Sequence, residues 1–147
     1  MGDKKHKVLI ADDYEADRFF LKEAIRRHAP DLEVVGELED GSDVIAYLTG
    51  RDGYADRVKH PLPDLLIMDV RMPRMSGLEV LDWLKIHPFP KMKVAMLADS
   101  SFMEFREKAA SFGLQHFYPK VINAGELVEV VRKLQAELED GTPDAHD

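Results

Sequence analysis

The sequence of 147 residues contains no cysteine and no long apolar run. The absence of cysteine excludes disulfides, thiol catalysis and cysteine-based zinc sites. No window approaches the roughly 18 apolar residues of a membrane span, and the apolar run that follows the basic first residues is too short for a secretion signal. We therefore expect a cytoplasmic protein without a membrane partner.

The chain has fewer basic than acidic residues, and its histidines do not cluster. The formal net charge is −8, which argues against a nucleic-acid partner because nucleic-acid binding needs a basic surface. The six histidines show no metal-ligand spacing, and the chain has no internal repeat. What is present, 45% hydrophobic and 33% charged residues, is typical of one globular domain with its own core.

Short apolar runs alternate with longer amphipathic segments along the chain. The alternation predicts an α/β fold, a doubly wound five-stranded parallel sheet of (βα)5 type, because fully apolar strands between helices are covered on both faces. The predicted strands are 7–11, 32–38, 64–69, 93–98 and 115–118, and the predicted helices are 14–28, 41–48, 77–87, 102–112 and one that opens at 123–126.

The segment 51–63 is long for a connection between a helix and a strand. It is either a tolerated surface insertion or a loop that contacts a partner. The sequence leaves both interpretations open.

Charged side chains follow the carboxyl ends of the predicted strands. Asp12 and Asp13 follow the first strand, Asp69 ends the third, and Lys120 follows the fifth. These ends meet at one edge of a doubly wound sheet, so we expect the side chains to converge. Two like charges about 4 Å apart repel by roughly 4 kcal/mol at an effective dielectric of 20. The acids therefore need a cation, and Mg²⁺ with oxygen ligands fits.

Each of these residues also has an ordinary interpretation when it is taken alone. Asp12 and Asp13 could be N-caps of the first helix, where aspartate is common. Asp69 could cap a turn, and Lys120 could be a surface lysine. Only their joint position at strand ends favours a functional site.

Several stretches of the sequence resemble the receiver domains of two-component response regulators. The first is the Asp12-Asp13 pair after KVLIA. The others are DVRMPRMSGLEVL from Asp69, VAMLADSS from Val94, FGLQHFYPK ending at Lys120, and LEDGSDVIAYL from Leu38. The first helix and the long loop are similar, more weakly, to stand-alone regulators paired with bacterial phytochromes.

The resemblance covers about residues 7–138 and implies a flavodoxin-like receiver fold there. Residues 1–6 would form an N-terminal extension, and residues 139–147 an acidic disordered tail. Because no second domain follows residue 138, we expect output through a partner or through self-association.

The resemblance also implies roles for individual residues. Asp69 would be the phosphoacceptor, and the protein would not be an enzyme beyond this chemistry on itself. Asp13, Asp69 and the backbone carbonyl of Arg71 would bind Mg²⁺, with Asp12 acting mostly through metal-bound water. Lys120 would pair with an oxygen of the phosphoryl group.

The sequence departs from the family at the end of the fourth strand. Ala98 stands where the family usually has Thr or Ser, so this switch position is degenerate and lacks the hydroxyl that bonds to the phosphoryl group. Asp99 follows it and adds negative charge, and Ser100 would supply a hydroxyl only after a slip in register. We therefore predict weak coupling between phosphorylation and conformational change.

A second departure follows Lys120. Val121 stands where the family usually has proline, often after a cis bond, and a cis bond before valine would cost about 2.5–4 kcal/mol. Phe117 fills the position of the aromatic switch residue.

The resemblance implies a sensor histidine kinase or a phosphotransfer protein as partner. It also implies a homodimer through the face of the fourth helix, fifth strand and fifth helix, where receivers often associate. The predicted helix 102–112 carries a stripe of Phe102, Phe105, Ala109 and Phe112, which is either part of the core or partly exposed as an interface. Two other classes compete with this interpretation. One is a receiver-like adaptor that acts without phosphorylation. The other is a hydrolase with an aspartyl nucleophile, which would need a second aspartate where Arg71 stands.

Overall fold

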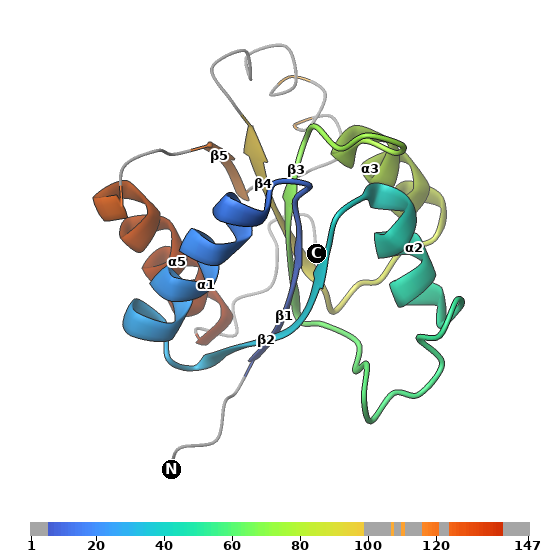
Figure 1. Ribbon diagram of the computed structural model, residues 1–147, viewed down its shortest axis with the longest axis horizontal. Helices are drawn as coiled ribbons and strands as arrows, with labels where there is room; N and C mark the ends of the chain where they lie inside the picture. Colours follow the sequence, from blue (N-terminus) through green and yellow to red (C-terminus); the bar gives the residue numbers. More distant parts are fainter. Residues whose placement is uncertain (1–5, 99–106, 108–109, 111–115, 121–123, 140–147) are drawn as a thin grey trace.

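The computed structural model describes residues 6–98, 107, 110, 116–120 and 124–139. Its centre is a five-stranded parallel sheet in the order β2-β1-β3-β4-β5 (Figure 1). The strands are β1 (His6–Ala11), β2 (Leu32–Leu38), β3 (Leu65–Asp69), β4 (Lys93–Ala98) and β5 (His116–Pro119). The predicted α/β fold is confirmed, although β1 begins at His6, inside the segment expected to be an N-terminal extension.

Helices cover both faces of the sheet. In Figure 1, α1 (Glu15–His28) and α5 (Ala124–Glu139) lie on one face, and α2 (Gly41–Thr49) and α3 (Gly77–Ile86) lie on the other. Of the predicted helix 102–112, only residues 107 and 110 are described, and both are helical. No helix in these ranges has the length and apolar character needed to cross a membrane.

The central strands are buried on both sides, which explains their uninterrupted apolar runs. Successive strand residues point to opposite faces. Leu66 and Met68 therefore pack in the cluster under α2 and α3, whereas Leu65 and Ile67 pack in the cluster under α1 and α5. Burying one such side chain contributes about 1.5–3 kcal/mol. These two clusters fix β3, and with it the position of Asp69 at its end.

The long segment after α2 folds back onto the end of that helix. Gly50 ends α2 in the left-handed conformation, with φ of 74°. The Arg57 guanidinium donates hydrogen bonds to the carbonyls of Tyr47, Leu48 and His60 at 2.9–3.1 Å. The bonds to Tyr47 and Leu48 satisfy carbonyls in the last turn of α2, which have no partner four residues further along the helix. The segment is therefore a packed loop at the amino-terminal edge of the sheet, and Val58 stays 92% exposed.

Candidate functional site

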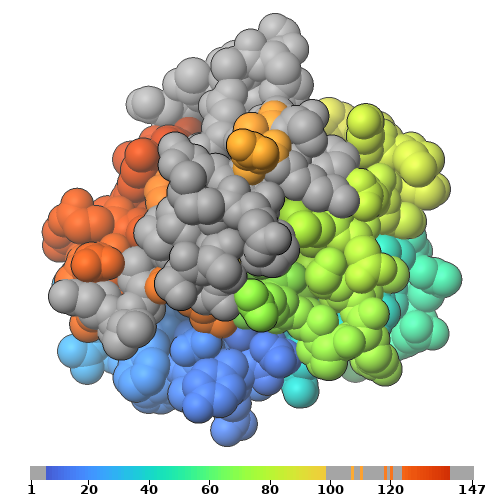
Figure 2. Space-filling model, turned by 90° about the horizontal axis from the view of Figure 1, so that it is seen from above, coloured from blue at the N-terminus to red at the C-terminus, as the bar shows by residue number. Residues whose placement is uncertain are grey.

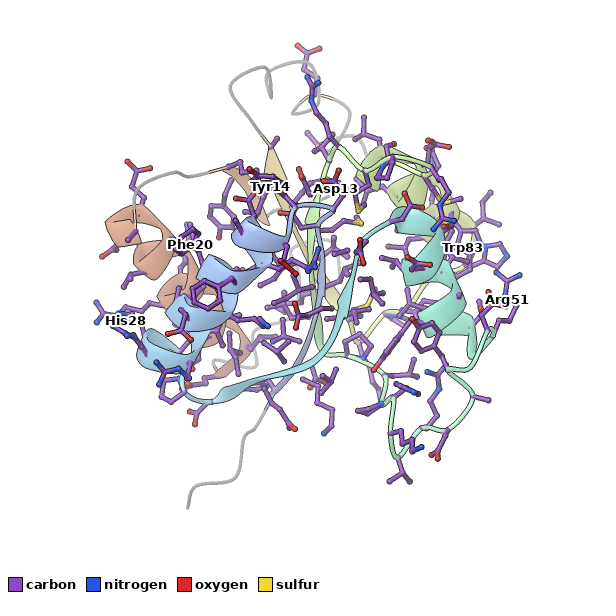
Figure 3. The ribbon with its side chains drawn as sticks, viewed as in Figure 1. Asp13, Tyr14, Phe20, His28, Arg51 and Trp83 are labelled. Atoms are coloured by element: carbon purple, nitrogen blue, oxygen red, sulfur yellow. The ribbon has the colours of Figure 1, made fainter. Side chains whose placement is uncertain are left out.

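Three carboxylates meet at the carboxyl-terminal edge of the sheet. Asp12 follows β1 and Asp69 ends β3, and both are nearly buried, whereas Asp13 is exposed. One oxygen of each carboxylate lies within 4.8 Å of the others. Figure 3 shows Asp13 and Tyr14 at this edge, and Figure 2 shows the same edge from above, where the blue β1–α1 segment and the green segment after β3 reach the surface.

The ammonium of Lys120 lies among these carboxylates. Its Nζ is 2.7 Å from Asp69 Oδ2 and 2.8 Å from Asp12 Oδ2. A third carboxylate, that of Asp17 in the first turn of α1, lies 2.8 Å from the same Nζ. Three acids, Asp12, Asp17 and Asp69, thus contact one ammonium. Together with Asp13, which lies beside Asp12 and Asp69, the group carries a net charge of −3 when all are ionised.

Burial and charge shift the pKa values of the site in opposite directions. Burial raises the pKa of the Asp12 carboxyl and of the Asp69 carboxyl, and the Lys120 ammonium only partly offsets this. Burial also acts to lower the pKa of Lys120, but hydrogen bonds to three carboxylates outweigh it and raise that pKa above its ordinary value. Lys120 is therefore a stable cation beside Asp69, and its positive charge favours the ionised form of that carboxyl.

The donor set fits a hard divalent cation. Carboxylate oxygens from Asp12, Asp13 and Asp69 are close enough together to share one ion. Mg²⁺ prefers oxygen ligands and binds through few carboxylates while it keeps several waters. One ammonium does not balance the acids, so a cation here would offset their repulsion.

The backbone after Asp69 turns sharply. The Gly77 amide donates to the Val70 carbonyl at 2.8 Å, which brings the start of α3 against the end of β3. A Cβ at Gly77 would lie 2.5 Å from the Asp69 carbonyl oxygen, so only glycine fits here. The Arg71 amide approaches Asp69 Oδ1 at 3.4 Å. This turn leaves the Asp69 carboxylate at the edge of the sheet.

A buried carboxylate holds the far end of this turn. Asp40 is 1% exposed and caps α2 by accepting from the Ser42 amide at 2.9 Å. It also accepts from the backbone amides of Arg74 at 2.7 Å and Met75 at 3.1 Å. Burial acts to raise the pKa of the Asp40 carboxyl, but the hydrogen bonds from the Ser42 hydroxyl and from these amides outweigh burial, so the pKa lies below its ordinary value. Asp40 thus joins the β2–α2 turn to the loop that follows Asp69.

The positions expected to form the switch are described only in part. Ala98 is buried at the end of β4, and its carbonyl accepts from the Lys120 backbone amide. Phe117 lies in β5, paired with Met96 of β4. Asp99, Ser100 and Val121 lie outside the described residues, as does most of the predicted helix 102–112. Their predicted effects, and the homodimer, stay predictions.

The structure brings together Asp12, Asp13, Asp69 and Lys120, as their strand-end positions suggested. The N-cap of α1 is Tyr14, so neither Asp12 nor Asp13 fills that role, although Asp12 Oδ1 accepts from the Tyr14 amide at 2.9 Å.

Sequence reasoning missed two acidic residues of the site. Asp17 lies in the first turn of the helix that begins just after Asp13, and this position could have placed it near the same edge. Asp40 directly precedes the Gly41-Ser42 start of α2, a position that favours aspartate as a cap.

A family model of the response regulator receiver domain matches residues 8–132. The chain belongs to this family. The receiver is therefore a signalling domain of two-component systems. It is 34% identical over 139 residues to a protein-glutamate methylesterase/protein-glutamine glutaminase of Pyrococcus horikoshii, covering 90% of the chain and 34% of that protein. The chain is also 34% identical over 129 residues to the response regulator protein VraR of Staphylococcus aureus. That match covers 86% of this chain and 55% of VraR. The receiver thus spans about a third to about half of these relatives.

Solved structures of receivers share the fold over most of the chain. The phosphorylated cyanobacterial phytochrome response regulator RcpA has a TM-score of 0.79 at 25% identity, covering 93% of this chain and 96% of that one. Response regulator RPA3017, in red light signaling of R. palustris, has a TM-score of 0.78 at 28% identity. That match covers 88% of this chain and 91% of RPA3017. Both resemble the receiver along nearly their whole length.

Proposed function

We propose that the protein accepts a phosphoryl group on Asp69 from a sensor histidine kinase or a phosphotransfer protein. One observation carries this proposal: the Asp69 carboxylate is held at the end of a buried strand, 2.7 Å from a lysine ammonium and within 4.8 Å of two further carboxylates. The test is incubation with acetyl phosphate and Mg²⁺, followed by intact-mass detection of one phosphoryl adduct.

The proposed step is a single displacement at phosphorus. A carboxylate oxygen of Asp69 forms the new P–O bond. The P–N bond of a phosphohistidine, or the P–O bond of an acyl phosphate, breaks, and the leaving group takes the bonding electron pair. Such transfer depends on positioning and on charge stabilisation. Lys120 supplies positive charge beside the attacking oxygen, and the buried β3 holds that oxygen in place.

The acidic cluster is the proposed site of Mg²⁺. Asp13, Asp69 and the Arg71 carbonyl would hold the ion, and Asp12 would act mainly through water. When bound, the ion would neutralise charge on the phosphoryl oxygens. The nearly buried positions of Asp12 and Asp69 would keep their carboxylates facing the ion.

Mg²⁺ is expected to stabilise the folded protein because it relieves repulsion among these carboxylates. At a concentration 100 times Kd, the free energy of unfolding should rise by about 2.7 kcal/mol. Thermal unfolding with and without Mg²⁺ measures this. Asp13→Asn should remove most of the gain, whereas Asp52→Asn, in the loop at the opposite edge of the sheet, should keep it. An equal gain in both variants would contradict the assignment.

Exposed aromatic side chains beside the site support a protein as phosphodonor. Tyr14, Phe19 and Phe20 are each more than half exposed, and the rings of Phe19 and Phe20 contact each other. Figure 3 shows Phe20 on α1, on the same helix that begins beside Asp13.

The likeness to RcpA and RPA3017 supports a phosphodonor in light-sensing pathways.

Ala98→Thr is expected to strengthen the conformational response to phosphorylation. A hydrogen bond to a charged group contributes about 1.5–3 kcal/mol, and wild-type Ala98 offers no such bond. Backbone NMR shifts at residues 98 and 117 should therefore change more on adding beryllium fluoride with Mg²⁺ to Ala98→Thr than to wild type.

Ala98→Val is the matched control because valine has nearly the shape of threonine without its hydroxyl. It should respond as wild type does. If Ala98→Thr and Ala98→Val give equal shift changes, the missing hydroxyl does not explain the response of the wild-type protein.

The second candidate is an adaptor that binds partners without phosphorylation. The alanine at the end of β4 favours it, because a receiver that does not switch needs no hydroxyl there. A protein that binds Mg²⁺ but takes no phosphoryl group from acetyl phosphate or from a phosphorylated kinase would support this candidate.

A further inference from the structure

The ammonium of Lys120 has no spare donor within the described part of the chain. An ammonium carries three N–H donors. Its Nζ lies 2.7–2.8 Å from one oxygen each of Asp12, Asp17 and Asp69. Any new partner of Lys120 must therefore displace or share one of these carboxylates.

The three carboxylates differ in how readily water can replace the lysine. The side chains of Asp12 and Asp69 are 8% and 7% exposed, and that of Asp17 is 36% exposed. Releasing a nearly buried carboxylate leaves a charge without partners, which is costly, whereas an exposed one becomes hydrated. Asp17 is thus the carboxylate that Lys120 can leave most easily.

We propose that Asp17 is a positioning residue that acts through Lys120: it holds the ammonium beside Asp69 before phosphorylation and releases it to the phosphoryl group afterwards. This inference rests on the proposed function, in which Asp69 is the acceptor. Asp17 also places a negative charge close to the incoming anion. Competition for the lysine and repulsion of the anion act in the same direction, so Asp17 weakens binding of a phosphoryl group.

The test measures the affinity for beryllium fluoride, a phosphoryl mimic, at saturating Mg²⁺ by calorimetry. Asp17→Asn should bind it about two- to fivefold more tightly than wild type, the range for one partly exposed ion pair. Asp17→Glu, which keeps the charge, should stay near wild type. Glu15→Gln is the matched control because it removes the same charge from the same turn of α1, and Glu15 is not among the three ion-pair partners of Lys120.

A double-mutant cycle separates the lysine-mediated effect from a general effect of charge. With Lys120→Gln as background, Asp17→Asn should change the affinity no more than Glu15→Gln does. Equal effects of Asp17→Asn and Glu15→Gln in the wild-type background, or weaker binding by Asp17→Asn, would overturn the inference while the proposed function stands. Failure of the wild-type protein to bind beryllium fluoride would overturn both.

Discussion

Asp69→Asn is expected to abolish uptake of a phosphoryl group. Asparagine keeps the shape of the side chain, so it should be tolerated at the end of β3. Its neutral amide oxygen is a poor nucleophile and does not form a stable acyl phosphate. The wild-type protein, incubated with acetyl phosphate and Mg²⁺, should gain the mass of one phosphoryl group, and the variant should gain none.

The matched control for this experiment is Asp52→Asn. Asp52 is exposed in the loop before β3, at the other end of the strand that carries Asp69. This variant should form the adduct as wild type does. Both variants should show the wild-type circular dichroism spectrum. An adduct on folded Asp69→Asn, in the amount seen for wild type, would mean that another residue is the acceptor.

Asp40→Ala is expected to cause the largest loss of stability among the changes considered. The substitution leaves the partly buried backbone amides of Ser42, Arg74 and Met75 without their acceptor. Leaving a hydrogen-bond donor without its acceptor costs about 1–3 kcal/mol in free energy of unfolding, so we expect a total loss of about 3 kcal/mol. Urea unfolding at neutral pH measures the loss.

Asp43→Ala is the control for the loss of charge. Asp43 lies three residues later in α2 and pairs with the same Arg74, but its side chain is 38% exposed, so its loss should cost about 0.2–1 kcal/mol. A similar loss in both variants would show that Asp40 does not clamp the loop.

The effect of Asp40→Ala should also depend on pH. The folded protein lowers the pKa of the Asp40 carboxyl below its value in the unfolded chain. The stability that this carboxylate contributes is therefore fully present above the unfolded pKa, and it is lost as the pH falls through the folded pKa. The difference in unfolding free energy between wild type and Asp40→Ala should shrink at acid pH. A constant difference across that range would argue that the ionised carboxylate is not what stabilises the loop.

Much of the fold was predictable from periodicity. The strands β2 and β4 have the predicted bounds, because turn and charged residues flank them on both sides. The ends of α2 and α3 differ from the prediction by one residue, since caps depend on local hydrogen bonds that a pattern does not show. Gly50 ends α2 in the left-handed conformation that glycine favours.

The part of the candidate site that lies at strand ends was predictable from the sequence. Asp12, Asp69 and Lys120 meet because parallel strands bring their carboxyl ends to one edge. The contacts of Asp17 and Asp40 depend on which side chains reach across from other elements. Asp17 reaches a lysine after β5, and Asp40 reaches amides after β3. Such contacts follow from packing in three dimensions, which composition and spacing do not determine.

The packed loop after α2 was beyond sequence reasoning for the same reason. Arg57 caps the carbonyls at the end of α2, and the Tyr47 hydroxyl donates to the Pro61 carbonyl at 2.9 Å. Nothing in the local sequence pairs these residues. Both earlier interpretations of the loop, a surface insertion and a partner-contacting segment, are compatible with this packing.

The most direct test of the central claim is chemical trapping of the acceptor. Borohydride reduces an acyl phosphate on an aspartyl side chain to the alcohol, which converts that aspartate into homoserine, and peptide mass spectrometry then locates the change. After incubation with acetyl phosphate and Mg²⁺, we predict homoserine at position 69 alone. Homoserine at another aspartate with Asp69 unchanged, or none in a protein that binds Mg²⁺, would contradict the account.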